Sequence, residues 1–138
     1  MFFTKHSIFF LRRSFSHGQP AAPAPRARYR RRSTTKQTMI FITQLIYLKE
    51  GQETIFHQFE DIAIPIIAKY NGRLLLRVRP DDKAFIEYHM DKPYEIHLVE
   101  FDTEQDFENF KHDEERKQFL HLKEQSIKAA ILIQGIKI

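Results

Sequence analysis

Four polar side chains interrupt otherwise apolar segments, and their types suit the binding of small oxygenated molecules. They are Gln44 in the run IFITQLIYL, Arg77 in RLLLRVR, and Glu95 and His97 in YEIHLVEF. An arginine in an apolar pocket binds a carboxylate or enolate oxygen, and a histidine serves as a general base near neutral pH. We therefore predict His97 and Arg77 as candidate catalytic residues. The candidate substrate-binding residues are Arg77, His97, Glu95, Gln44 and Glu100.

A structural role is the simpler explanation of the same side chains. Arg77 and Glu95 then pair with each other across neighbouring strands or at a subunit interface, and His97 is an interface histidine whose hydrogen bonds are satisfied. Glu100 receives hydrogen bonds from a strand end or from Arg73. The sequence leaves both interpretations open, a binding site and a set of structural pairs.

The composition argues against several kinds of site. The chain has no Cys, which rules out disulfides, thiolate catalysis and cysteine metal sites. His112 and His121 have acidic neighbours, but their spacing matches no metal-binding motif. Only four Gly are present and none are clustered, so a phosphate-binding loop and a dinucleotide fingerprint are absent. We expect neither a metal nor a cofactor, and the sequence leaves open whether the protein is an enzyme.

Hydrophobic periodicity predicts a strand and then a helix after Met39. Residues 40–48 alternate as a strand rich in β-branched and aromatic side chains. A helix follows to about Tyr70, and Glu60 lies outside its apolar stripe, which consists of Ile55, Phe59, Ile62, Ile66 and Tyr70. We expect Pro65 to kink this helix and Asn71-Gly72 to end it with a left-handed residue.

The second half of the domain repeats strands and helices. The predicted elements are strands at 73–79 and 94–101 with a short extended piece at 85–89 between them, a helix capped by Thr103, a helical stretch from about Asp113 to Lys128, and a strand at 131–138. The order strand, helix, strand, strand, helix, strand is the βαββαβ ferredoxin-like plan. That plan is an α+β fold with one antiparallel sheet and helices on one face.

The other face of such a sheet has no helices, and here it is predicted to be apolar. Alternation in the second strand places Leu74, Leu76 and Val78 on one face, and Arg73, Leu75, Arg77 and Arg79 on the other. We expect Leu75, Val99 and Phe101 on the uncovered face, where they expose more apolar surface than a monomer usually tolerates. We therefore predict a homodimer that closes sheet on sheet as a dimeric α/β barrel.

The net charge of +4 combines two unlike segments. Residues 1–38 contain nine Lys or Arg and no acidic residue, whereas residues 39–138 contain 13 basic and 18 acidic residues. We therefore divide the chain into a disordered basic extension at 1–38 and a ferredoxin-like domain at 39–138. The acidic domain argues against nucleic-acid binding. No apolar run approaches the roughly 18 to 20 residues of a membrane-spanning helix.

Three interpretations of the extension stay open. In the first, Met39 is the true start, the extension is translated upstream sequence and the protein is cytoplasmic. In the second, the extension is an organellar transit peptide, because it is rich in Arg and free of acidic residues. In the third, it is a basic arm that binds nucleic acid or an anionic surface. The arginines of that arm are Arg26, Arg28, Arg30, Arg31 and Arg32.

The domain resembles the domain-of-unknown-function 1330 family of the dimeric alpha/beta-barrel superfamily in the segments IPIIAKYNGRLLLR, HLVEFDTEQDFENF and DEERKQFLHLKEQSIKAAILIQG. The matching positions are Pro65, Lys69, Tyr70, Gly72, Arg77, Glu100 and Phe101. Asn71 replaces a Gly, and residues 80–93 depart most from the family pattern. The resemblance covers most of 39–138 and implies a homodimer. It implies no established reaction, because the superfamily ranges from cofactor-free monooxygenases and isomerases to haem proteins.

Two functions of different kinds are consistent with these observations. The first is the binding of a small oxygenated organic molecule in a cavity between sheet and helices, as in a cofactor-independent monooxygenase or isomerase. The second is a non-catalytic dimeric module whose cavity is filled by its own side chains. The two differ in whether His97 and Arg77 contact a ligand.

Overall fold

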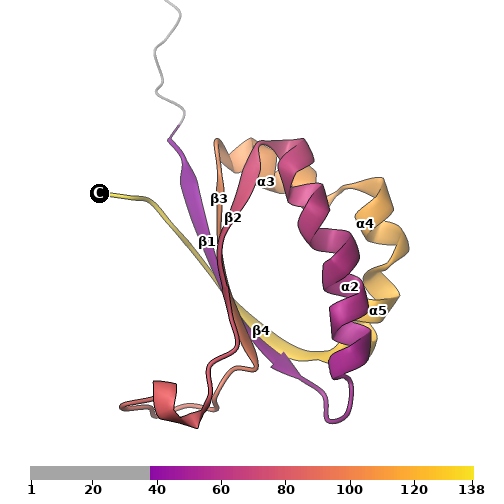
Figure 1. Cartoon of the computed structure of the whole chain (residues 1–138). Helices are drawn as coiled ribbons and strands as arrows, with labels where there is room; N and C mark the ends of the chain where they lie inside the picture. The colour runs from indigo at the N-terminus through magenta and orange to yellow at the C-terminus, as the bar shows by residue number, and fades with distance from the viewer. Residues whose placement is uncertain (1–37) are drawn as a thin grey trace, which may run out of the picture. The chain divides into compact units, whose positions relative to one another are not determined.

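The computed structural model describes residues 38–138, and the predictions for residues 1–37 lie outside the described residues. The elements in order are β1 (Ile40–Leu48), α2 (Glu53–Ile66), the 3-10 helix η1 (Ile67–Tyr70), β2 (Gly72–Val78), the 3-10 helix η2 (Asp82–Ala84), β3 (Glu95–Phe101), α3 (Glu104–Lys111), α4 (Glu114–Gln118), α5 (Leu120–Ser126) and β4 (Ile127–Gly135). The strands form one antiparallel sheet in the order β2-β3-β1-β4. The α-helices lie on one face of it (Figure 1).

The predicted α+β ferredoxin-like fold is confirmed by this arrangement. Each strand pairs only with antiparallel neighbours, and each of the two helical segments connects strands that are not adjacent in the sheet. Within residues 38–138 no helix combines the length and the hydrophobicity needed to cross a membrane.

Local sequence signals set the ends of two helices. Thr103 Oγ1 accepts a hydrogen bond from the backbone N–H of Asp106 at 3.0 Å, which caps α3 as predicted. Asn71 has a φ of 55°, and this left-handed residue ends η1 as predicted. Gly72 begins β2, where an added Cβ would lie only 2.6 Å from side-chain atoms of Ile67 and Phe101. The turn therefore needs both residues, one for its φ and one for its small size.

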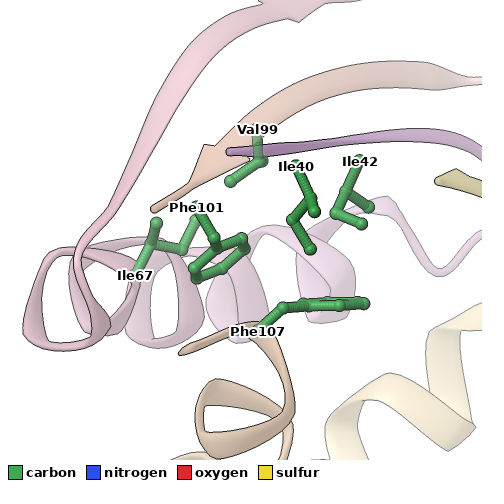
Figure 2. Packing of buried hydrophobic residues seen from close by; sticks show 6 residues of the cluster. All are labelled: Ile40, Ile42, Ile67, Val99, Phe101 and Phe107. Carbon is green, nitrogen blue, oxygen red and sulfur yellow. The ribbon is translucent and has the colours of Figure 1, made fainter. Parts of the chain in front are cut away.

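The hydrophobic core lies between the sheet and the helices. A buried cluster at the end near α3 consists of Ile40, Ile42, Ile67, Val99, Phe101 and Phe107 (Figure 2). Val99 and Phe101 are 8% and 1% exposed, so the prediction that they lie on the uncovered face is wrong. Both faces of β3 carry apolar side chains, and alternation separates two faces without indicating which one the helices cover.

A β-bulge in β2 changes which side chains face the helices. The register pairs Leu74 with Val99, Leu76 with Leu98 and Arg77 with His97, which leaves Leu75 as the additional residue. Directly opposed residues of an antiparallel pair lie on the same face of the sheet. Leu74 and Arg77 therefore both face the helices, and the strict alternation predicted for this strand is wrong at the bulge.

Helix α2 packs on the sheet through a stripe that is rotated from the predicted one. Its buried residues are Phe56, Phe59, Glu60, Ala63 and Ile66. Glu60 was expected in solvent and is only 6% exposed, so that expectation is wrong. Pro65 lies inside the last turn of α2, after which the chain tightens into η1.

The C-terminal part departs from prediction in its boundaries. The helical stretch predicted from about Asp113 to Lys128 is two helices, α4 and α5, which are separated at Phe119. Strand β4 begins at Ile127, earlier than the predicted residue 131. The backbone N–H of Lys49 donates to the carbonyl of Ser126 at 2.8 Å, which brings the start of β4 to the end of β1. Long-range strand pairing therefore extends β4 into residues with a helical pattern.

Candidate functional site

A cavity lies between the sheet and the helices, beside the hydrophobic cluster. Its volume is about 70 Å³, whereas a single water molecule needs roughly 10 to 15 Å³. Most of its wall is apolar, and the polar side chains in the wall are Gln44, Glu60, His97, Arg116 and Lys123. An apolar cavity with a few convergent polar groups is the usual form of a small-molecule site.

Strand β3 places His97 and Glu95 side by side on the helix-facing side of the sheet. The two residues are two positions apart, so their side chains leave the strand on the same face. His97 is 4% exposed, and its Nε2 lies 2.5 Å from Glu95 Oε1. The pair forms a buried carboxylate–imidazole dyad at the cavity wall.

Glu95 is fully buried and is surrounded by hydrogen-bond donors. Arg77 Nε donates to its Oε1 at 2.5 Å, and Arg79 Nε donates to its Oε2 at 2.7 Å. Burial raises the pKa of Glu95, but hydrogen bonds from Arg77, His97 and Arg79 outweigh burial and lower the pKa below its ordinary value. Glu95 is therefore an anion near neutral pH, and it acts as a fixed acceptor.

The ionised Glu95 determines which nitrogen of His97 carries hydrogen. Because the carboxylate only accepts hydrogen bonds, Nε2 of the neutral imidazole is the N–H and Nδ1 keeps its lone pair. Burial lowers the pKa of His97, and this effect outweighs the opposing hydrogen bond to Glu95. His97 is thus a neutral base near pH 7. Its Nδ1 lies 4.0 Å from Glu60 Oε2 on α2.

Glu60 supplies a second titrating group to the cavity. Burial raises its pKa from 4.5 to about 7, and the negative charge of Glu95 adds to the rise. The carboxyl group of Glu60 is therefore protonated in a substantial fraction of molecules at neutral pH. A neutral base and a carboxylic acid whose surroundings shift their pKa values in opposite directions are the usual components of acid–base catalysis.

Two cations reach the cavity from the helical side. Arg116 comes from α4 and Lys123 from α5, and both side chains line the cavity wall. Burial lowers the pKa of Arg116, and burial followed by the charge of Arg116 lowers the pKa of Lys123. Together with Glu60 they make the helical wall the more highly charged side of the cavity.

The structure brings together most of the residues predicted from sequence. Gln44 and His97 line the cavity, whereas Glu95 and Arg77 lie behind His97 and reach a shallow depression at the β2 edge. The expected pairing of Arg77 with Glu95 is confirmed by their hydrogen bond. Glu100 is not part of this group, because its Oε1 accepts from Arg73 Nε at 2.6 Å, the structural role that was the alternative.

Sequence reasoning missed Glu60, Arg116 and Lys123. All three lie on helices, where a charged residue is normally assigned to the solvent-exposed face. One signal was available for Glu60, which lies four residues after Phe56 and three before Ala63 on one helical stripe. Arg116 and Lys123 give no such signal, because a break at Phe119 separates their helices.

The face of the sheet opposite the helices is apolar, and the segment 85–93 lies over part of it, where it lines a depression with Leu45 and Ile96. In Figure 1 it lies to the left of the strands and carries no α-helix. The side chains on this face that are more than a third exposed include Leu76, Val78, Ile131 and Ile133. Half-buried apolar residues between them are Phe41, Leu45, Ile96 and Leu98. This set of eight residues is called the open face below.

The fold and the cavity define a ferredoxin-like α+β protein with a mainly apolar cavity that contains a few polar groups, and solved structures share its fold. A protein of unknown function from Rhodopseudomonas palustris is 10% identical, with a TM-score of 0.64 over 74% of this chain and 84% of that one. A NIPSNAP family protein of unknown function from Agrobacterium tumefaciens is 19% identical, with a TM-score of 0.55 over 73% and 89%.

A third structure resembles the chain and is described by its assembly. This protein, from Bacteroides fragilis, is described as a dimeric protein of unknown function with a ferredoxin-like fold; it is 13% identical, with a TM-score of 0.55 over 72% of this chain and 96% of that one. No family model matches the sequence, and no curated protein matches it. The solved structures therefore establish the fold of this chain.

Proposed function

We propose that this chain is a homodimeric protein that binds a small oxygenated organic molecule in the cavity between the sheet and the helices. The observation that carries the proposal is the cavity itself, an apolar space with polar groups from both walls. A core that served only stability would be filled to high density and would leave few polar atoms without partners.

The dyad of His97 and Glu95, together with Glu60, fits proton transfer on the bound molecule. Nδ1 of His97 is the base, and the carboxyl group of Glu60, 4.0 Å away, is the acid. A ligand atom beside this pair, within hydrogen-bond distance of both atoms, would exchange protons with both. The reaction class that this arrangement supports is isomerisation next to a carbonyl group, which needs no cofactor.

We also propose that the chain belongs with the domain-of-unknown-function 1330 proteins that its sequence resembles. The turn that the resemblance emphasises has a physical basis, since Asn71 adopts a left-handed conformation and Gly72 has no room for a Cβ. Tyr70, another matching position, donates to Asp113 at 2.5 Å and links η1 to the start of α4.

Ligand binding is tested by a thermal-shift screen of small aromatic and keto acids and their neutral analogues. A ligand at about 100 times its Kd is expected to stabilise the protein by about 2.7 kcal/mol. Ala63→Leu inserts a side chain into the cavity wall and is expected to abolish the shift. Ala68→Leu is the matched control, because Ala68 is exposed on η1 and should leave the shift unchanged.

The contrary outcome favours a non-catalytic module. The cavity has only a structural role if no compound shifts the unfolding temperature of the wild-type protein and Ala63→Leu makes the protein more stable by filling unused space.

The open face supports the homodimer. Its apolar side chains are contiguous across β2, β3, β1 and β4, and a face of this kind is a protein interaction site more often than a monomer surface. A second copy of the chain offers the same face, and pairing about a two-fold axis removes both apolar faces from water.

Leu98→Lys is expected to dissociate the dimer. Leu98 lies on β3 within the open face, so a lysine there is tolerated by a single chain but is left as an unpaired charge between two sheets. Analytical ultracentrifugation should show two chains per particle for the wild type and one for Leu98→Lys. Ala68→Lys on the helical side should remain a dimer. A wild-type particle of one chain at high concentration would contradict the proposal.

A further inference from the structure

Arg116 is held in place by contacts that leave one edge of its guanidinium unused. Its Nη1 donates to the backbone carbonyl of Lys111 at 3.2 Å, and its Cζ lies 5.2 Å and 6.0 Å from the ring centroids of Phe110 and Phe59. The backbone N–H of Arg116 donates to Asp113 at 2.8 Å, which fixes the first turn of α4. The side chain is therefore oriented by protein contacts before any ligand arrives.

The unused edge contains a buried donor without a partner. Nε of Arg116 is buried and makes no hydrogen bond to the residues that the structure describes. An unsatisfied buried donor is destabilising, so native proteins rarely keep one without a reason. The edge formed by Nε and Nη2 is the one that binds a carboxylate through two parallel hydrogen bonds, and Nη1 on the opposite edge is already occupied by Lys111.

Lys123 adds a second positive charge to the same wall. Its ammonium group makes no ion pair or hydrogen bond with residues 38–138. Because Arg116 and Lys123 repel each other, an anion bound beside both would remove an unfavourable interaction.

The acidic groups near these cations neutralise them only in part. Asp113 is already bonded to the hydroxyl of Tyr70 and to the backbone of Arg116. Glu60 forms no close ion pair with either cation within the described part of the chain; its charge attracts both when it is ionised, but its raised pKa of about 7 keeps it protonated in part at neutral pH. The helical wall therefore retains positive charge that an anionic ligand can neutralise.

We propose that the cavity is specific for a small monocarboxylate, whose carboxylate group is bound by Arg116 and Lys123 and whose apolar part lies against Ile42, Val99 and Phe107. This inference rests on the proposed function and names its ligand class. One carboxylate matches the fork of Arg116, and the apolar remainder of the wall has no groups for a second charge.

The orientation follows from the two walls of the cavity. The carboxylate faces the helical wall, and the carbon skeleton extends toward the sheet, where Nδ1 of His97 is available. The carbon next to the carboxylate is then the part of the ligand that lies between the cations and the base.

Isothermal titration calorimetry with matched acids and amides tests the proposal. The probes are propionate, hexanoate and benzoate, each compared with its primary amide. The wild-type protein is expected to bind the best acid on the order of 100-fold more tightly than its amide, because only the acid engages a buried charge pair.

Two substitutions test whether Arg116 and Lys123 cause the preference for the acid, and a third serves as a control. Arg116→Met keeps an unbranched apolar stem without the guanidinium and should remove the preference. Lys123→Met should reduce the preference about tenfold, the effect of a single charge contact. Lys117→Met is the control on the same helix, since Lys117 is exposed and pairs with Glu114. Circular dichroism at each titration temperature confirms that every variant is folded.

The outcomes separate this inference from the proposed function. Amides that bind as tightly as acids, or an acid preference that survives in both Arg116→Met and Lys123→Met, would overturn the carboxylate site and leave a ligand cavity in place. If Arg116→Met does not fold, Lys123→Met alone decides the matter. Absence of binding by every acid and amide to the wild-type protein would overturn both proposals.

Discussion

Glu60→Gln is expected to remove a pH dependence of stability that the wild-type protein shows between about pH 4.5 and pH 7. The pKa of Glu60 is raised from 4.5 to about 7 in the folded state, because the carboxyl group is buried and lies near the charge of Glu95. The folded protein therefore holds a proton that the unfolded chain releases. Stability from this group is fully present below pH 4.5 and is lost as the pH rises through 7.

The size of this effect is about 3 kcal/mol, since each pKa unit corresponds to about 1.4 kcal/mol. Glutamine has the shape of the protonated acid and no charge to lose. Relative to wild type, the variant should gain about 3 kcal/mol between pH 4.5 and pH 8. The free energy of unfolding from urea titrations at each pH measures the gain.

Glu53→Gln is the control for the pH series. Glu53 lies in the first turn of the same helix and is exposed, so its substitution should leave the shape of the pH curve unchanged. If the curves for wild type and Glu60→Gln run parallel from pH 4.5 to pH 8, Glu60 is not a buried acid of raised pKa, and the acid–base pair with His97 is wrong.

Glu95→Gln is expected to lower the free energy of unfolding by about 3 kcal/mol at pH 7, near the lower end of the range for breaking a buried ion pair. The carboxylate of Glu95 is fully buried and binds Arg77, Arg79 and His97. The side chains of Arg77 and Arg79 are 29% and 47% exposed, so water compensates them in part after the substitution. Because of that hydration, we expect the loss of unfolding free energy to lie near the lower end of the range for breaking a buried ion pair.

Glu100→Gln is the matched control for this prediction. Glu100 lies on the same strand and also pairs with an arginine, but that arginine, Arg73, keeps a second partner in Asp102. The expected loss is about 1 kcal/mol or less, as for other ion pairs near the surface. Equal losses for Glu95→Gln and Glu100→Gln would show that the network around Glu95 has no special role.

The order of elements was predictable because β1, α2 and β3 have a clear hydrophobic period. The alternation in 40–48 and in 94–101 indicates strands, and Thr103 and Asn71 carry the local chemistry of a cap and a stop. These signals are local, and they do not depend on which elements meet. The strand order of a ferredoxin-like fold then follows from the order along the chain.

The faces of the strands were not predictable in the same way. Val99 and Phe101 pack against the helices although Ile96 and Leu98 on the other face are equally apolar, so burial is decided by tertiary packing. The bulge at Leu75 lies within three consecutive leucines, where a shift of register changes no hydrophobic pattern.

The candidate site was half predictable for a related reason. His97 and Glu95 were identifiable because a polar side chain inside an apolar strand requires a partner. Charged residues on helices are usually solvated, so Arg116 and Lys123 could be assigned to the cavity only once the helices were placed on the sheet. The sheet contributes the base to the cavity, and the helices contribute the acid Glu60 and the two cations.

Native mass spectrometry of the protein purified from its own source examines the cavity most directly. We expect a particle of two chains that carries the added mass of a small organic acid, and we expect the Ala63→Leu protein to carry none. Particles without added mass from every preparation, together with no acid that restores it on incubation, would contradict the proposal that this fold holds a ligand.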